Sequence, residues 1–271
     1  MGPDEQVTEE AIGAAEKLRS KGEFATALDL CQQMLACTQD GDLRMRLLFD
    51  IVSCAASLDQ PVVVESAMAE LDKMPNHEYS RVLANLNRAW AETSLGRPAN
   101  ALNLLDMGLA TGLFEADDMR VHKYRLCLFK GDALLHLRRP EQALEWLDRG
   151  HELYPTIEAG SSAEERQIFA WVEPNIQINR ANCLLAFDRY EESFQAAEQV
   201  RKFDKPDLAT LAMQYMAECR VRQCRVPEAL EIYSRLKERL PCRLVDESRI
   251  REGISNCMSY LEKQKPSSRP S

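Results

Sequence analysis

The sequence predicts an all-α fold, a right-handed superhelical solenoid of about six helical hairpins closed by a C-terminal capping helix. One observation is a stretch of 26 residues, 130–155, that is patterned as a helix, a tight break and a second helix. Another is the recurrence of this pattern along the whole chain. The third is the placement of prolines where four of the second helices should begin.

The stretch 130–155 reads KGDALLHLRRPEQALEWLDRGHELYP. Small residues, Gly131 and Ala133, precede apolar ones at helical spacing, and Arg138-Arg139-Pro140 interrupts the run. Ala143, Leu144 and Leu147 then recur with the period of a second helix, which we expect Pro155 to end.

Five further copies of this pattern can be aligned with the first. In each copy one residue, usually small, falls where the second helix should cross the first: Ala27, Val64, Ala101, Ala143, Ser193 and Ala229. The intervals between these positions are 37, 37, 42, 50 and 36 residues. The longest interval maps to Thr156–Val172, where Gly160–Ser162 predicts a loop. Beyond it, we expect Pro174 to break or kink a long helix.

Prolines predict where the hairpins turn. A proline suits the first turn of a helix, because its missing N–H would have no partner there and its φ is already helical. The four in question are Pro61, Pro98, Pro140 and Pro227.

This pattern resembles the tetratricopeptide repeat, a helical hairpin of about 34 residues with a small residue, an alanine and a closing proline. The resemblance implies a solenoid over residues 1–263 and a disordered tail over 264–271. We expect hairpins near 8–38, 42–74, 78–111, 117–154, 163–202 and 206–240, and an amphipathic capping helix at 244–263.

Composition limits the classes of partner. The net charge is −9, which argues against nucleic acid, because a phosphate backbone requires clustered lysine and arginine. No apolar run reaches the ~20 residues that cross a bilayer, and the acidic start, MGPDEQVTEEAIG, does not resemble a signal peptide. We therefore expect a cytoplasmic protein without membrane insertion.

The nine cysteines form no CxxC pair, and we expect reduced thiols. Cys31, Cys54, Cys183 and Cys219 lie on apolar helical faces, where cysteine behaves as a small hydrophobic residue.

The sequence predicts neither catalytic residues, nor metal ligands, nor a cofactor. No phosphate-binding glycine loop, GxSxG or HExxH motif occurs, and the four histidines are scattered. We expect His136 to be an exposed helical histidine rather than a ligand. The chain is therefore predicted not to be an enzyme.

In a stack of such hairpins the first helices line a concave groove. We expect this groove to be lined by polar residues of the third to sixth hairpins: Asn87, Arg125, Asp132, Asn175, Asn179, Asn182, Gln214, Glu218 and Arg222. Three asparagines on one face of a helix are unusual, because asparagine is a mediocre helix former, and each amide can both donate to and accept from a peptide backbone. The alternatives are a solvated polar face, or asparagines that cap a break at Pro174.

Two further resemblances concern the function. Asn87-Arg88-Ala89 and Asn179-Arg180-Ala181 are similar to the Asn-Arg-Ala-Ala of carboxylate-clamp repeats. The neighbouring helices do not complete the clamp at either copy, although Arg125 follows Asn87, and Asp132 would repel a carboxylate. Residues 126–197 are faintly similar to the C-terminal repeats of a subunit of the TRAPP membrane-trafficking tether.

The predicted function is a non-catalytic protein–protein interaction adaptor that binds a peptide or helical segment of a protein partner in the groove. A competing hypothesis is a structural subunit of a multiprotein complex, which would bind through the convex face or the hairpin edges. A further competitor is a thiol-dependent activity, which would need an exposed cysteine of lowered pKa.

Overall fold

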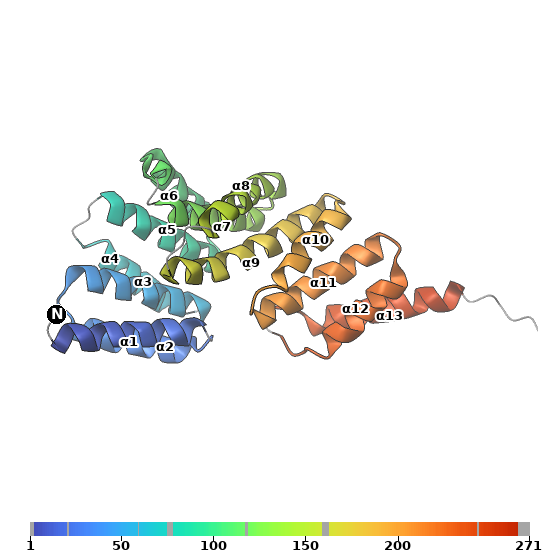
Figure 1. Ribbon diagram of the computed structural model, residues 1–271, viewed down its shortest axis with the longest axis horizontal. Helices are drawn as coiled ribbons and strands as arrows, with labels where there is room; N and C mark the ends of the chain where they lie inside the picture. Colours follow the sequence, from blue (N-terminus) through green and yellow to red (C-terminus); the bar gives the residue numbers. More distant parts are fainter. Residues whose placement is uncertain are drawn as a thin grey trace, which may run out of the picture. The chain divides into compact units, whose positions relative to one another are not determined.

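The structure, a computed structural model, describes residues 3–20, 22–58, 60–74, 78–116, 119–158, 163–242 and 244–264. Every regular element within these residues is a helix, so the predicted all-α class is confirmed. The chain divides into two compact units, Met1–His122 and Lys123–Ser271, which we call unit 1 and unit 2 (Figure 1).

In unit 1 the helices follow one another as pairs joined by short turns (Figure 1). Its elements are α1 (Pro3–Ser20), α2 (Phe24–Cys37), α3 (Gly41–Ser57), α4 (Pro61–Leu71), α5 (Glu78–Ser94), α6 (Pro98–Ala110) and the short 3-10 helix η1 (Leu113–Glu115). Each helix packs on the next along the chain, and α3 also packs on α5, so the first helices of successive pairs are neighbours.

Unit 2 also consists of helices that follow one another as pairs, and its first helix, α7, begins three residues before the boundary at Lys123. Its elements are α7 (Arg120–His136), α8 (Pro140–Glu158), α9 (Ala163–Ala186), α10 (Tyr190–Val200), α11 (Pro206–Arg222), α12 (Val226–Lys237) and α13 (Glu247–Gln264). Here α9 packs on α8, α10 and α11, which places it at the centre of the unit.

The small residues predicted at the hairpin crossings are all fully buried. Ala27, Val64, Ala101, Ala143, Ser193 and Ala229 each have 0% of their surface exposed. Within the fourth hairpin, a Cβ placed on Gly131 of α7 would lie 2.6 Å from Cγ of Leu147 on α8. Leu147 is itself fully buried, so the two helices can approach this closely only because residue 131 has no side chain.

Proline positions agree with the prediction at the hairpin turns. Helices α4, α6 and α8 begin at Pro61, Pro98 and Pro140, and Pro227 is the second residue of α12. In addition, Pro206 begins the first helix α11, which the sequence pattern did not indicate.

The expected helix end at Pro155 and the expected break at Pro174 are wrong, and a kink at Pro174 stays a prediction. Helix α8 does not end at Pro155 but runs to Glu158, and α9 does not break at Pro174. A proline within a helix removes one hydrogen bond and crowds the preceding turn, but its φ remains helical, so packing can hold the helix together. Pro174 is buried, in the helix that packs on three neighbours.

The turns between paired helices share one hydrogen-bond pattern. After α7, the N–H of Arg139 donates to the carbonyl of Leu134 over 2.9 Å. Arg138, which directly precedes Arg139, has a φ of 57°. This is the Schellman motif, which requires a left-handed residue at the end of the helix. Unit 1 uses Gly22 and Gly96 at the matching positions, with φ of 80° and 74°. In unit 2, the left-handed residues that follow α9 and α11 are Asp188 and Cys224, with φ of 59° and 60°.

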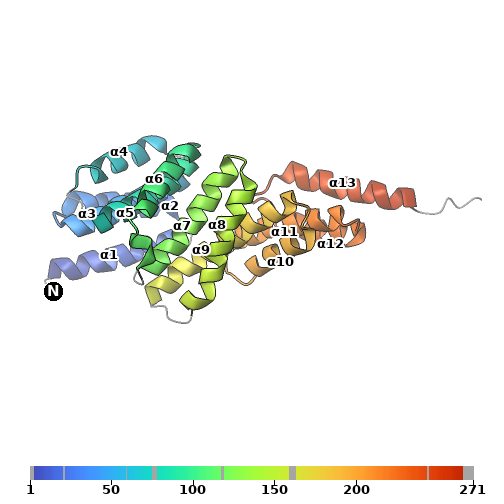
Figure 2. The same cartoon turned by 90° about the horizontal axis from the view of Figure 1, so that it is seen from above.

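The last helix, α13, covers an apolar cluster of unit 2, as predicted for the capping helix. Ile250 and Cys257 of α13 pack in a cluster with Tyr233 and Leu236 of α12. The end of α13 extends past α12 (Figure 2). The tail was predicted over 264–271, but Gln264 still belongs to α13. Residues 265–271 and the predicted loop Gly160–Ser162 lie outside the described residues.

Replacing Gly131 by alanine should destabilise the chain by about 1–3 kcal/mol, because the added methyl group overlaps the buried Leu147 side chain. Urea unfolding followed by circular dichroism measures this effect. Gly13→Ala is the matched control: Gly13 lies in α1 with no atom within 4 Å of the added Cβ. That substitution should stabilise by up to ~1 kcal/mol. Equal effects at the two positions would contradict the close approach.

Replacing Cys224 by glycine should stabilise the chain by about 0.5–1 kcal/mol, because glycine adopts a φ of 60° without the steric cost that a Cβ imposes. The control Cys37→Gly removes another exposed cysteine, but at the last residue of α2. It should not stabilise the chain. Thermal melting distinguishes the two, and stabilisation by both variants would point to the thiol rather than to the backbone.

Candidate functional site

The predicted groove residues fall in both units. Asn87 lies on α5 in unit 1, and its side-chain N–H₂ donates to the carbonyl of Leu83 in its own helix over 3.1 Å. The other predicted residues lie on α7, α9 and α11 of unit 2. The candidate site therefore lies within unit 2.

An aromatic pair joins α7 to α9. The edge of Trp171 meets Phe129, with ring centroids 6.0 Å apart and planes at 68°. The guanidinium carbon of Arg125, one turn before Phe129, lies 5.6 Å from the centroid of the Phe129 ring. Phe129 is buried, whereas 36% of Trp171 is exposed. A partly exposed cation and an exposed indole thus both contact one buried ring.

A polar pair joins the same two helices further along. The side-chain nitrogen of Asn179 lies 3.5 Å from Oδ1 of Asp132, at the outer limit of a hydrogen bond. His136 lies one turn after Asp132, with Nδ1 3.7 Å from the same oxygen, and it is exposed as predicted. Burial raises the pKa of the Asp132 carboxyl above its usual value, and the proximity of His136 and Asn179 opposes this shift.

The asparagines of α9 have different surroundings. Asn175 donates to the carbonyl of Trp171 over 2.6 Å. Because Pro174 has no N–H to donate to the turn before it, this side chain adds a hydrogen bond to the adjacent carbonyl and supports the continuous helix. Asn182, in contrast, is exposed. The alternative in which asparagines cap a break at Pro174 is excluded, since there is no break.

Helix α11 supplies the last three predicted residues. Gln214 is buried and donates to Oε1 of Glu218 over 2.8 Å, so its amide orients Glu218 rather than facing solvent. Arg222, at the end of the helix, is exposed.

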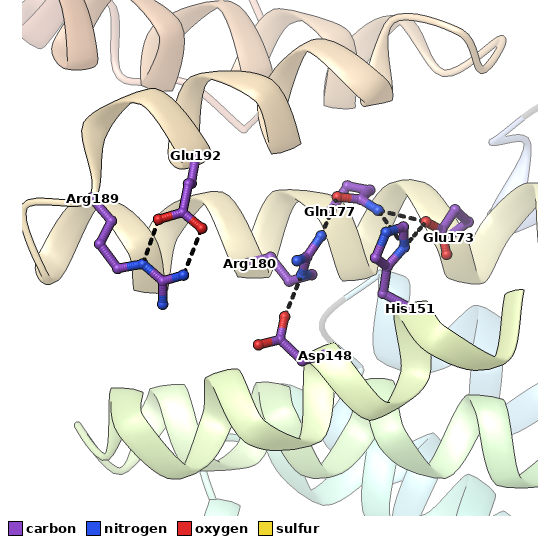
Figure 3. A network of polar contacts seen from close by, with 7 residues as sticks. All are labelled: Asp148, His151, Glu173, Gln177, Arg180, Arg189 and Glu192. Carbon is purple, nitrogen blue, oxygen red and sulfur yellow. Dashed lines mark hydrogen bonds and ion pairs between the residues drawn. The ribbon is translucent and has the colours of Figure 1, made fainter.

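Beneath this surface lies a buried polar network that the sequence analysis did not identify (Figure 3). Oε1 of Glu173 accepts from Nε2 of Gln177 over 2.6 Å and lies 3.0 Å from Nδ1 of His151. Its other oxygen accepts from the hydroxyl of Tyr124. Glu173 and Gln177 are only 3% and 1% exposed. The network therefore ties α7, α8 and α9 together, with Tyr124, Glu173 and Gln177 buried and the side chain of His151 partly exposed.

An ion pair continues this network toward the surface (Figure 3). Arg180 donates to Oε1 of Gln177 over 3.0 Å and to Oδ1 of Asp148 on α8 over 2.7 Å.

Burial and the adjacent Glu173 carboxylate raise the pKa of Tyr124 far above its ordinary value. The Tyr124 hydroxyl therefore remains a donor to Glu173 at any physiological pH.

Sequence reasoning missed Trp171, Glu173 and Gln177 for identifiable reasons. Trp171 was placed in a lengthened connection, although a spacing of four residues from Trp171 to Asn175 and on to Asn179 puts all three on one helical face. Glu173 and Gln177 are polar, and polar residues on a helix are usually exposed. Only the positions of their partners on α7 and α8 explain their burial.

The cysteines predicted on apolar faces are buried, which confirms that prediction, and all nine thiols are free. Burial raises the pKa of Cys31 and Cys183 to about 12 and that of Cys54 to about 11. A thiolate is therefore disfavoured at these positions. Among the described residues, no group of His, Cys, Asp and Glu is arranged to hold a metal ion. No described helix combines the length and the apolar character needed to cross a membrane.

Comparison with solved structures shows the fold. The chain is similar to the apo form of RapI, with a TM-score of 0.68 and 8% identity over 95% of this chain and 72% of that chain. It is also similar to PilF of Pseudomonas aeruginosa, with a TM-score of 0.55 and 12% identity over 96% and 99%. A third similar structure is a tetratricopeptide repeat protein from Parabacteroides merdae, with a TM-score of 0.47 and 15% identity over 93% and 99%.

The predicted tetratricopeptide-like fold is thereby confirmed. No protein-family model and no curated protein matches the chain. The resemblance to a TRAPP subunit is not shown by these comparisons and stays a prediction.

Replacing Tyr124 by phenylalanine should destabilise the chain by about 1–3 kcal/mol, because the buried Glu173 carboxylate loses a hydrogen-bond donor that water cannot replace. Urea unfolding at neutral pH measures the loss. Tyr260→Phe, at an exposed position on α13, removes a hydroxyl of the same kind and should change the stability by less than ~0.5 kcal/mol. An unchanged stability for Tyr124→Phe would mean that this hydroxyl does not support Glu173.

Proposed function

We propose that the chain is a non-catalytic protein–protein interaction module that binds a segment of a partner protein on one face of unit 2. We call it the first-helix face and define it by exposed or partly exposed residues of α7, α9 and α11: Arg125, Asp132, Trp171, Asn175, Asn179, Asn182, Glu218 and Arg222. The observation that carries the proposal is the exposed indole of Trp171, held against Phe129 beside Arg125. Tryptophan and arginine are the residues most enriched at the energetic centres of protein interfaces.

The polar residues next to Trp171 suit recognition of a main chain. The amides of Asn179 and Asn182 each offer a donor and an acceptor, which match the N–H and C=O groups of an extended or helical segment. Asp132 and Arg222 add charges of opposite sign on different helices. Such charges select the direction in which a charged segment lies.

The buried network supports this face from below. Glu173 and Gln177 lie on α9 between Trp171 and Asn179, and they are bonded to α7 and α8. A helix held in this way loses little conformational freedom when a partner binds, so less of the binding free energy is spent on ordering the site.

A second candidate function is a structural subunit of a multiprotein complex that binds through the convex face or the hairpin edges. The observation that favours it is the exposure of two large apolar side chains on second helices of unit 1. Val62 on α4 is 77% exposed and Met107 on α6 is 59% exposed. Scattered exposed apolar residues are common on protein surfaces, so this candidate ranks below the first.

Affinity purification from cell lysate, followed by mass spectrometry, tests the first proposal. The baits are the native chain, Trp171→Ala, and the triple variant Arg125→Glu/Asn179→Asp/Asn182→Asp. We expect a protein that the native chain retains to be reduced by at least about tenfold with both variants, as for loss of an interface centre. The purified partner is then titrated against each bait to give the affinity.

The controls alter similar side chains elsewhere. Tyr260→Ala removes an exposed aromatic ring from α13, and Asn103→Asp adds a carboxylate to an exposed position on α6. Circular dichroism establishes that all variants keep the native helicity and melting temperature. Retention of the same proteins by every bait would reject the first-helix face. Loss of them only with Val62→Asp or Met107→Asp would favour the second candidate.

A further inference from the structure

A second surface of unit 2 combines an indole with clustered positive charge. Trp146 of α8 is partly exposed, and two cations lie against its ring. Nζ of Lys130 on α7 is 4.2 Å from a centroid of the ring system, and the guanidinium carbon of Arg149 is 4.8 Å from one. Cation–π attraction thus holds both charges in place around a surface aromatic group.

A third cation, Lys123, lies one helical turn before Cys127 on α7. This buried thiol is in close contact with α8, since a Cβ on Gly150 would lie 3.0 Å from Cβ of Cys127. Burial raises the pKa of Cys127 to about 12, and Lys123, Arg149 and Lys130 lower it. Lys123, Lys130, Trp146 and Arg149 form what we call the Trp146 patch.

The Trp146 patch differs in position from the first-helix face. On α7, Lys123 and Lys130 are seven residues apart and share one side of the helix. Arg125 and Asp132 of the first-helix face lie on a side turned by roughly half a circle at 100° per residue. The two surfaces therefore use opposite sides of α7.

Charge in this region contrasts with that of the whole chain. The net charge is −9, yet three cations gather at the Trp146 patch. Exposed Glu145 and Glu152 lie one turn on either side of Arg149, so the positive surface is bounded along α8. A ligand that fits the Trp146 patch covers only a short length of α8. It carries carboxylates beside an apolar group that can contact the indole.

We propose that the Trp146 patch binds an acidic peptide segment of a protein partner. Carboxylates of the segment pair with Lys123, Lys130 and Arg149, and an apolar side chain of the segment contacts the exposed part of the Trp146 ring. The chain then carries a second docking surface, which does not depend on the first-helix face.

Fluorescence anisotropy with the full chain tests this proposal. The probe is a short labelled peptide that alternates Glu and Leu, and the reference peptide alternates Lys and Leu. We expect the native chain to bind the acidic peptide saturably and to bind the basic one more weakly. The variant Lys130→Glu/Arg149→Glu should weaken acidic-peptide binding by about tenfold or more at low salt, as for the reversal of two charge pairs. Trp146→Ala should weaken it as well.

The matched control is Arg235→Glu/Lys237→Glu, which makes the same change in net charge at exposed positions of α12. Its affinity for the acidic peptide should stay closer to the native value than that of Lys130→Glu/Arg149→Glu at the same salt concentration, because the reversed charges are not those that lie against Trp146. Trp171→Ala should have no effect, which separates this proposal from the proposed function.

Several outcomes would overturn the proposal. These are no saturable binding of the acidic peptide by the native chain, equal weakening by the two charge-reversal variants, or full affinity of Trp146→Ala. Binding of a single-stranded oligonucleotide, but not of the peptide, with loss in Lys130→Glu/Arg149→Glu would assign the patch to nucleic acid instead. Circular dichroism of each variant ensures that a loss of binding is not a loss of fold.

Discussion

The close approach of the two helices within each hairpin is the constraint on which the rest of this structure depends. In the fourth hairpin, α7 can reach α8 because Gly131 leaves room for the side chain of Leu147. In every hairpin, the residue at the equivalent crossing of the second helix has no exposed surface. Because interiors are close-packed, this contact sets the distance between the helices and hence the position of each outward-facing side chain.

The Schellman turns act together with this constraint. A left-handed residue follows α1, α5, α7, α9 and α11, where it ends the helix and reverses the chain. Proline at or near the start of α4, α6, α8 and α12 then suits the first turn of the second helix. Local backbone chemistry therefore determines where a hairpin turns, and the small residues determine how closely its helices pack. Both signals are periodic along the chain, which is why the fold class and the helix pairs could be predicted from sequence.

The errors in that prediction arose where tertiary contacts outweigh a local rule. Pro155 and Pro174 are signals for a helix end, yet both lie within helices. At Pro174 the helix is held by packing on three neighbours, and Asn175 donates to the carbonyl one turn earlier. In contrast, the helical register of Asp132 and Asn179 was enough to predict that they share a surface. The burial of Glu173 could not be predicted in this way, because its partners Tyr124 and His151 are far from it in sequence.

The same buried carboxylate determines how independent the two surfaces of unit 2 can be. Glu173 bonds to α7 and α8, which carry the Trp146 patch, and it lies in α9 beside Trp171 of the first-helix face. A buried charge that loses its partners costs far more than an exposed one, so these three helices must keep one arrangement whichever surface is occupied. A rigid base of this kind transmits little conformational change between the two sites. For the two proposed surfaces we therefore expect additive binding, so that a partner that contacts both would gain affinity through effective concentration rather than through cooperativity.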